Sequence, residues 1–248
     1  ITKNQTELLK FLKHFRYSTG VNQYKVWLEI SRGAVRKNIK EFRKLLDTST
    51  KLFAVVKSNA YGHGLLTFSG IVNSDVDGFC VDSVVEGLKL RTNGITKPII
   101  VLGYTLPYLY KTAAQNNITV TISSFEALRD FARSAVKPYF HLKIDTGMRR
   151  QGFYLHDLQK IIQRIKNQES THQRYLRHHG AGQARIKNKI TGIYTHFAAA
   201  KDGTDQAFTK KQSAEFAKAI ASMENAGFTT LLTHAAATGG TLLGKELH

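Results

Sequence analysis

Strand-like and helical segments alternate along most of this chain of 248 residues. Short apolar runs typical of buried strands cover 52–57, 78–82, 98–102, 118–122, 139–144, 190–196 and 229–234. Segments with helical spacing of apolar residues fall between them, for example 83–91, 124–135, 154–167 and 207–226. This alternation favours right-handed βαβ units and a parallel sheet. Seven strands followed by helices predict an α/β fold, a (β/α)8 TIM-type barrel that lacks its last strand.

The two ends of the chain bound this barrel. The seventh strand-like run is followed closely by His248, and a barrel needs an eighth strand to pair with its first. We therefore expect the native polypeptide to continue beyond His248. At the other end, residues 7–16 have the pattern of a short amphipathic helix and 18–23 that of a linker. Residues 1–23 are thus predicted to be a helical extension and linker, and 24–248 the incomplete barrel, which opens with a strand-like run at 26–30 and a helix at 34–46.

The net charge of +18 is unusual, with 36 lysines and arginines against 18 acidic residues. Such a surface attracts nucleic acid and other anions without specificity, so a basic nucleic-acid-associated protein is one alternative. The densest basic run is 172–189, which contains Gly180 and Gly182 and reads as a loop. It lacks the aromatic platform that single-strand binders use, which favours a solvated loop and no specific nucleic-acid partner.

The remaining composition is typical of a globular cytoplasmic protein, with 42% hydrophobic residues. No apolar run approaches the roughly 18 residues that a membrane span needs. Lysines interrupt the N-terminal apolar positions, which does not fit a signal peptide. The single cysteine, Cys80, excludes an internal disulfide and is expected to be a reduced core residue. The histidines show no zinc-binding spacing with it, so no metal site is predicted.

Polar residues follow four of the expected strands. Lys57 ends the first, Asp145 and Arg150 follow the fifth, His196 ends the sixth and His234 ends the seventh. In a barrel, functional residues gather at the C-terminal ends of the strands, so these side chains are expected to surround one mouth. Taken singly, a strand-end lysine could be merely solvated, and the carboxylate of Asp145 could cap backbone groups of an ordinary turn.

Lys57 has the strongest chemical implication. It ends an apolar run and precedes Tyr61 and a glycine-rich turn. Desolvation at the end of a buried strand favours the neutral amine, which is the form that condenses with the aldehyde of a cofactor to give a Schiff base.

Four segments, in the same order along the chain, resemble the alanine racemases, which are fold-type III enzymes that depend on pyridoxal 5'-phosphate (PLP). They are Ala54–Gly64, His141–Arg150, Gly192–Ala200 and Thr233–Thr238. The run Trp27–Ile30 followed by Asn38 is also similar. The resemblance extends from about residue 24 to the C-terminus and implies the N-terminal barrel domain of such an enzyme.

The resemblance implies a role for each matching residue. Lys57 would bind PLP as an aldimine and act as the base on one face of the substrate Cα. Tyr61 and Thr238 would contact the cofactor phosphate, and His196 would stack against its ring. Arg150 would bind the phenolic oxygen of PLP and the substrate carboxylate. Lys143 matches a lysine that is carbamylated in some members, where it orients the arginine.

The implied reaction is racemisation of L-alanine to D-alanine for peptidoglycan synthesis by a homodimer. It needs two bases. The family's second base is a tyrosine in a C-terminal β-domain, and an arginine on the eighth strand contacts the ring nitrogen; both segments are absent from these 248 residues. Two positions also depart from the family pattern, with Arg149 in place of glycine and Ala237 in place of asparagine. The alternative is therefore a non-catalytic PLP-binding barrel or an inactive fragment.

Overall fold

The computed structural model describes residues 25–167, 186–202 and 204–247. The chain divides into two compact units, residues 1–31 and 32–248. The helix expected at 7–16, the linker at 18–23 and most of the basic loop at 172–189 lie outside the described residues. Within the described residues, no helix combines the length and hydropathy that crossing a membrane requires.

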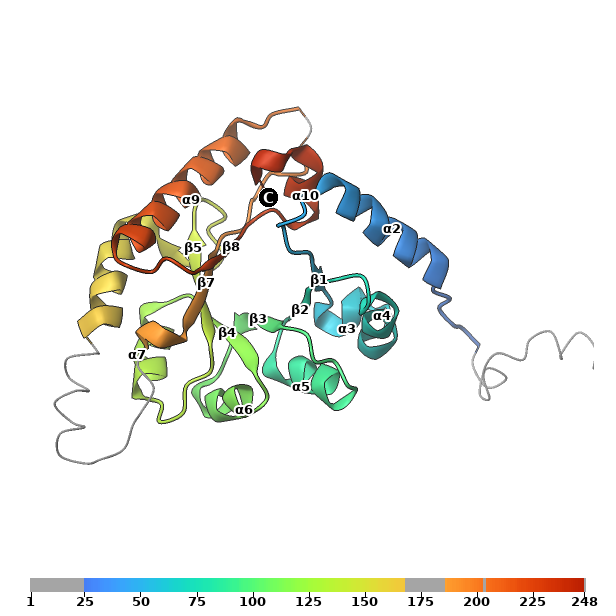
Figure 1. Cartoon of the computed structure of the whole chain (residues 1–248), viewed down its shortest axis with the longest axis horizontal. Helices are drawn as coiled ribbons and strands as arrows, with labels where there is room; N and C mark the ends of the chain where they lie inside the picture. Colours follow the sequence, from blue (N-terminus) through green and yellow to red (C-terminus); the bar gives the residue numbers. More distant parts are fainter. Residues whose placement is uncertain (1–24, 168–185, 203, 248) are drawn as a thin grey trace, which may run out of the picture. The chain divides into compact units, whose positions relative to one another are not determined.

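The second unit is built on a curved parallel sheet, whose strands follow an arc in Figure 1. The seven strands pair in the order β1-β2-β3-β4-β5-β7-β8, with a short strand β6 added beside β5. Their bounds are β1 Phe53–Val55, β2 Gly78–Val81, β3 Ile99–Tyr104, β4 Ile118–Ile122, β5 Phe140–Asp145, β6 Phe153–Tyr154, β7 Ile190–Tyr194 and β8 Leu232–His234. All seven strand-like runs of the expected barrel are therefore confirmed as parallel strands.

Most of the helices lie on the outer side of this arc (Figure 1). The helices are α2 Arg32–Leu45, α3 Lys57–Tyr61, α4 Leu65–Val72, α5 Val84–Thr92, α6 Tyr110–Gln115, α7 Phe125–Arg133, α9 Ala207–Asn225, α10 Ala237–Leu243 and a helical stretch over 158–167. Helix α10 lies beside α2 at the gap between the two ends of the arc (Figure 1). Short 3-10 helices occupy Pro107–Leu109, Leu155–Asp157, Lys187–Lys189 and Lys245–Leu247. The sheet is open, because β1 and β8 form its two edges and do not pair with each other.

Local sequence explains where the helices begin. Ser83 and Ser124 each follow a buried strand, and each accepts a hydrogen bond from the amide three residues on. This is the N-cap arrangement, which satisfies a backbone donor that the helix itself leaves without a partner. The interior is apolar: Phe131 packs edge-on against Phe140, with ring centroids 4.9 Å apart. Cys80 is a buried free thiol, as expected, and burial raises its pKa to about 12.

Three details of the expected fold are wrong. Residues 26–30 form no strand, because no other strand pairs with them, and Val26 is 84% exposed. The helix expected at 154–167 begins at 158, after β6 and a 3-10 turn. Lys57 does not end a strand either: β1 stops at Val55, and Lys57 begins the short element α3.

Candidate functional site

The charged groups at the carboxyl ends of the strands influence one another. Lys143 lies in β5, where burial lowers the pKa of its amine to about 8. Burial is the largest cause of this value; Arg150 and Lys57 also contribute to lowering the pKa, and Asp145 acts to raise it. Because charges influence one another's pKa only at short range, these interactions place Lys57 and Arg150 in the same region as Lys143, although Lys57 is distant from the other two in sequence.

His196, two residues beyond β7, belongs to the same region. Burial lowers its pKa, and the charges of Arg150, Lys143 and Lys57 lower it further, in that order. Its imidazole is therefore neutral at neutral pH. The mouth of the sheet thus combines three cationic side chains with one neutral aromatic ring.

The backbone after Lys57 makes one turn of left-handed helix. Residues 58–61 have φ between 52° and 55°, although none of them is a glycine. Each such residue costs about 1–2 kcal/mol relative to the right-handed region. The turn closes through a hydrogen bond from the Ala60 amide to the Val56 carbonyl, 2.8 Å. Gly62, at φ 93°, ends it. Lys57 is therefore followed by a strained segment that other contacts must hold.

One such contact was missed from the sequence. Glu86 in α5 accepts a hydrogen bond from the Asn59 amide, with 3.0 Å between nitrogen and oxygen. A usable signal existed, because Ser83 followed three residues later by Glu86 has the spacing of a capping box. In the structure, however, the Glu86 carboxylate also accepts from the amide of Asp82.

The Asp145 carboxylate stabilises a turn. One of its oxygens accepts hydrogen bonds from the amides of Gly147, at 2.9 Å, and Arg149, at 3.0 Å. The interpretation of this residue as a turn cap is confirmed. Arg149 occupies a left-handed conformation with φ 56°, which glycine adopts at no steric cost. Ala237, the other departure from the family pattern, likewise has a positive φ of 47°.

Lys143 is held by a short polar chain. Its ammonium donates to the side-chain oxygen of Gln151, 3.3 Å away, and the Gln151 amide nitrogen donates to Ser123, 3.0 Å away. The ammonium also lies 5.3 Å from the centre of the Tyr194 ring. A lysine with a pKa of about 8 carries a substantial neutral fraction near that pH, and the neutral amine is the reactive form.

Tyr61 and Thr238 follow the two edge strands. Tyr61 ends the left-handed turn after β1, and its side chain is 61% exposed. Thr238 lies in the first turn of α10, after β8, and is exposed. These two residues, which are predicted to contact the phosphate, therefore lie next to the two unpaired edges of the sheet.

A second residue missed from the sequence is Gln212, in α9, which is fully buried. Its oxygen accepts from the Ala198 amide at 2.8 Å, and its nitrogen lies 3.2 Å from the Thr146 hydroxyl and 3.3 Å from the His196 carbonyl. It therefore ties the loop after β7 to the loop after β5. A lone glutamine in an amphipathic helix gave no signal of this role.

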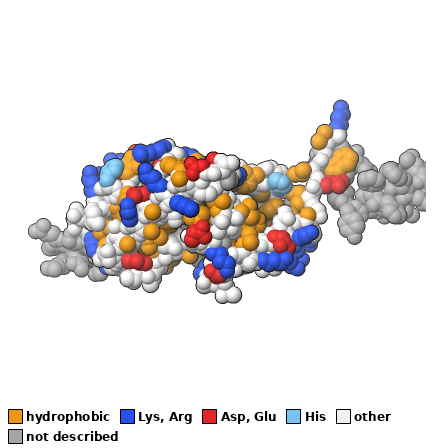
Figure 2. Space-filling model, turned by 90° about the horizontal axis from the view of Figure 1, so that it is seen from above, with side chains coloured by type: hydrophobic (Ala, Val, Ile, Leu, Met, Phe, Trp, Pro, Cys, Tyr) orange, Lys and Arg blue, Asp and Glu red, His pale blue; other side chains and the backbone are white. Residues whose placement is uncertain are grey.

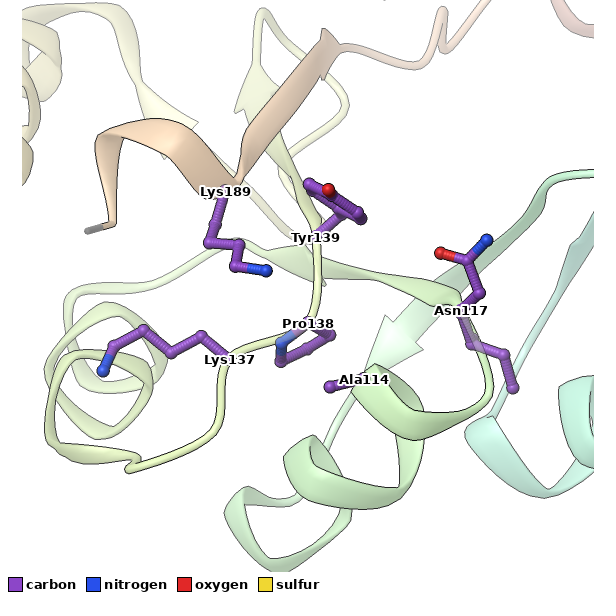
Figure 3. A pocket seen from close by; sticks show the side chains of 7 residues that line it. Ala114, Asn117, Lys137, Pro138, Tyr139 and Lys189 are labelled. Atoms are coloured by element: carbon purple, nitrogen blue, oxygen red, sulfur yellow. The ribbon is translucent and has the colours of Figure 1, made fainter. Parts of the chain in front are cut away.

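The pocket shown in Figure 3 is not lined by any of the predicted site residues. It is formed where β4, β5 and β7 begin, at the end of the sheet opposite Lys57. Its lining residues are Ala114, Asn117, Ile118, Lys137, Pro138, Tyr139 and Lys189. The Lys189 ammonium lies 4.5 Å from the centre of the Tyr139 ring. A cavity volume of about 30 Å³ admits water but no cofactor. Among the described residues, no group of three histidine, cysteine or acidic side chains could hold a metal ion.

Comparison with known proteins points to one family. The family model "Alanine racemase, N-terminal domain" matches residues 30–248. The alanine racemase of Methanococcus maripaludis is 32% identical over 229 residues, covering 90% of this chain and 57% of the relative. That of Streptococcus pneumoniae strain Taiwan19F-14 is 34% identical over 220 residues, covering 88% of this chain and 54% of the relative.

Comparison with solved structures points to the same family. Alanine racemase from Clostridium difficile 630 in complex with cycloserine superposes with a TM-score of 0.74 at 29% identity, covering 88% of this chain and 57% of that one. The Bacillus anthracis enzyme with bound L-Ala-P gives a TM-score of 0.75 at 26% identity, covering 89% and 54%. The chain thus spans about half the length of the relatives that it matches.

Proposed function

Because the chain belongs to the alanine racemase family, as its N-terminal barrel domain, we propose that it is the cofactor-binding part of a PLP-dependent enzyme that interconverts L- and D-alanine. The observation that supports this most is the convergence of Lys57, Lys143, Arg150 and His196 at one end of the sheet. The second base, the dimer partner and a role in peptidoglycan synthesis belong to the same proposal.

The donor set fits the cofactor. PLP carries a dianionic phosphate, a phenolic oxygen and an aldehyde. The mouth supplies positive charge, since Arg150 and Lys57 both lower the pKa of Lys143, while the Asp145 carboxylate is engaged with backbone amides. Such a cluster of cations is stabilised by an anionic ligand.

Each residue has a distinct task in this proposal. Lys57 would hold the cofactor through its aldehyde, and its amine, when free of the cofactor, would take or return the proton on one face of the substrate Cα. Arg150 binds the phenolic oxygen and the substrate carboxylate, which orients the substrate. The neutral His196 ring packs against the pyridine ring, and Tyr61 and Thr238 hold the phosphate. Lys143, once carbamylated, orients Arg150. When bound, PLP supplies a ring that delocalises the negative charge left at Cα.

The test uses the product of the complete reading frame. We expect added PLP to give a visible absorption band from the lysine-bound cofactor, and Lys57→Ala to abolish it. Reduction with borohydride followed by peptide mass spectrometry should place the label on Lys57. A wild-type protein that stays colourless with PLP, or a label on another lysine, would contradict the proposal.

A non-catalytic PLP-binding barrel is the second candidate, favoured by the left-handed Arg149 and Ala237 at positions where the family has glycine and asparagine. Conversion of L-alanine to D-alanine by the same preparation distinguishes the two. A nucleic-acid function has less support: on the face in Figure 2, lysines and arginines are dispersed among apolar and acidic side chains.

A further inference from the structure

The turn that follows Lys57 is strained. Four consecutive residues, 58–61, occupy the left-handed region, and none is glycine. At about 1–2 kcal/mol each, their strain is larger than the gain of about 1 kcal/mol from each of the four backbone hydrogen bonds in the turn, which run from Ala60 to Val56, from Gly62 and Gly64 to Asn59, and from His63 to Ala60. If the turn relaxed, the backbone that leaves Lys57 would change direction. The position of the Lys57 amine therefore depends on whatever holds this turn.

The Glu86 side chain is placed to hold this turn. One carboxylate oxygen accepts from the Asn59 amide at 3.0 Å, and the other accepts from the Asp82 amide at 2.9 Å. Asp82 follows β2 directly, and β2 is the strand that pairs with β1. The carboxylate thus connects the left-handed turn to the neighbouring strand end through two charge-assisted hydrogen bonds, which are stronger than neutral ones.

The backbone of Glu86 is itself held in place. Its amide donates to the Ser83 hydroxyl, so it occupies the third position of a capped helix. On the other side of the turn, the Asn59 side-chain oxygen accepts from the Leu65 amide at 2.8 Å. Residue 59 is therefore held from both sides, by its own amide through Glu86 and by its side chain through α4.

We propose that Glu86 is a positioning residue for Lys57: its carboxylate clamps the left-handed turn and so presents the lysine amine to the cofactor. The inference rests on the proposed function for its link to PLP, but the clamp itself is a property of the ligand-free protein. Glu86 does not touch the cofactor or substrate in this proposal, and it acts only through the backbone at Asn59.

The decisive variants are Glu86→Ala and Glu86→Gln, with Glu126→Gln as the matched control. Glu86→Ala removes both acceptors. Glu86→Gln keeps the side-chain length but replaces one acceptor by a donor that cannot satisfy an amide. Glu126→Gln makes the same change of charge in the first turn of another capped helix, α7, where the carboxylate is exposed and lies 3.9 Å from Arg129. All three are made in the product of the complete reading frame.

Two measurements test the clamp. Hydrogen exchange in ligand-free protein is expected to accelerate roughly tenfold or more at residues 58–64 in both Glu86 variants, and to remain at the wild-type rate there in Glu126→Gln. The apparent PLP dissociation constant is expected to rise roughly tenfold in the Glu86 variants, because a smaller fraction of molecules is competent to bind. Glu126→Gln should bind PLP as the wild type does.

The outcomes separate the two proposals. Wild-type exchange at 58–64 in Glu86→Gln overturns the clamp, whatever PLP does. Accelerated exchange with unchanged PLP affinity overturns the link to Lys57. If the wild type itself binds no PLP, the proposed function fails, and the exchange rates still decide whether Glu86 holds the turn. Where Glu86→Ala fails to fold, Glu86→Gln decides the question.

Discussion

His141 and His234 form a hydrogen bond inside the curved sheet, with 2.9 Å between Nδ1 of the first and Nε2 of the second. The bond joins β5 to β8, and the His234 ring stacks on Tyr194 with centroids 4.5 Å apart. Burial lowers the pKa of His141 to about 4. Burial also lowers the pKa of His234, and His141 and Lys143 lower it further. Both rings are therefore neutral at pH 7, and one ring donates the hydrogen bond that the other accepts.

This pair predicts that the protein loses stability in weak acid. Because the folded-state pKa of His141 lies below the ordinary value of 6.5, the unfolded chain takes up protons first as the pH falls from 6.5 towards 4. The free energy of unfolding should therefore decrease with falling pH in this window, by roughly 2 kcal/mol between pH 7 and pH 5 from this group. Urea unfolding at pH 7, 6 and 5 measures the loss.

His141→Gln keeps a polar partner for His234 but does not titrate, so its loss of stability over the same window should be smaller. The control is His156→Gln, since the His156 side chain is 78% exposed. A profile for His141→Gln as steep as that of the wild type would refute the assignment.

Gly192 makes room for this histidine pair. A Cβ atom at residue 192 would lie 2.6 Å from the ring of His141, which its bond to His234 holds in place. Gly192→Ala should therefore lower the free energy of unfolding by about 1–3 kcal/mol. Gly70→Ala is the control, because Gly70 lies inside α4 with nothing within 4 Å of its would-be Cβ. That change should stabilise by about 0.5–1 kcal/mol. Equal effects at both sites, measured by urea unfolding, would argue against a steric role for Gly192.

The sequence predicted the sheet well because apolar runs at regular spacing report burial directly. It also placed His196 near Lys57 and Arg150, since parallel strands that alternate with helices all end at the same side, whereas His234 lies inside the curved sheet against His141. A local apolar run does not determine whether a segment pairs with another strand. Residues 26–30 have the composition of a strand but remain unpaired, because pairing depends on a neighbour that only the tertiary structure supplies.

The supporting contacts of the site were beyond sequence reasoning for a similar reason. Nothing in residues 58–61 indicates a left-handed turn, since Ser58 and Ala60 avoid that region unless distant groups impose it. The polar partners of the turn and of the His196 loop come from helices far along the chain. Glu86 and Gln212 become visible only when their hydrogen bonds are known.

Arg149 offers a test of strain beside the site. Its φ of 56° costs a residue with a side chain about 1 kcal/mol or more. Part of this is offset by the guanidinium, which lies 5.0 Å from the centre of the Tyr154 ring. Arg149→Gly should raise the free energy of unfolding by about 0.5–1 kcal/mol. Arg149→Lys keeps the strained backbone and should bring no gain; if it stabilises as much as glycine does, charge and not φ is responsible.

Gln212 links fold stability to the site through the His196 loop. Gln212→Leu leaves the Ala198 amide without its partner and removes one of the two partners of the Thr146 hydroxyl, which keeps its bond to Thr195; the change should cost roughly 1–3 kcal/mol. The matched control lies one turn earlier in α9: Thr209 is also buried, and its hydroxyl has no hydrogen-bond partner among the described residues. Thr209→Val should be neutral or stabilise by about 1 kcal/mol, because it removes a polar group that makes no bond.

The two variants should also differ at the site. Releasing the His196 carbonyl frees the loop that carries the ring expected to stack on the cofactor, so Gln212→Leu should weaken PLP binding under conditions where the protein is still folded. Thr209→Val should bind as the wild type does. Because both changes replace one buried polar side chain of the same helix by an apolar one, a general loss of packing would affect the two alike. A PLP affinity that falls only in Gln212→Leu therefore identifies the tether to His196 as the cause, and unchanged affinity there would limit Gln212 to a role in stability.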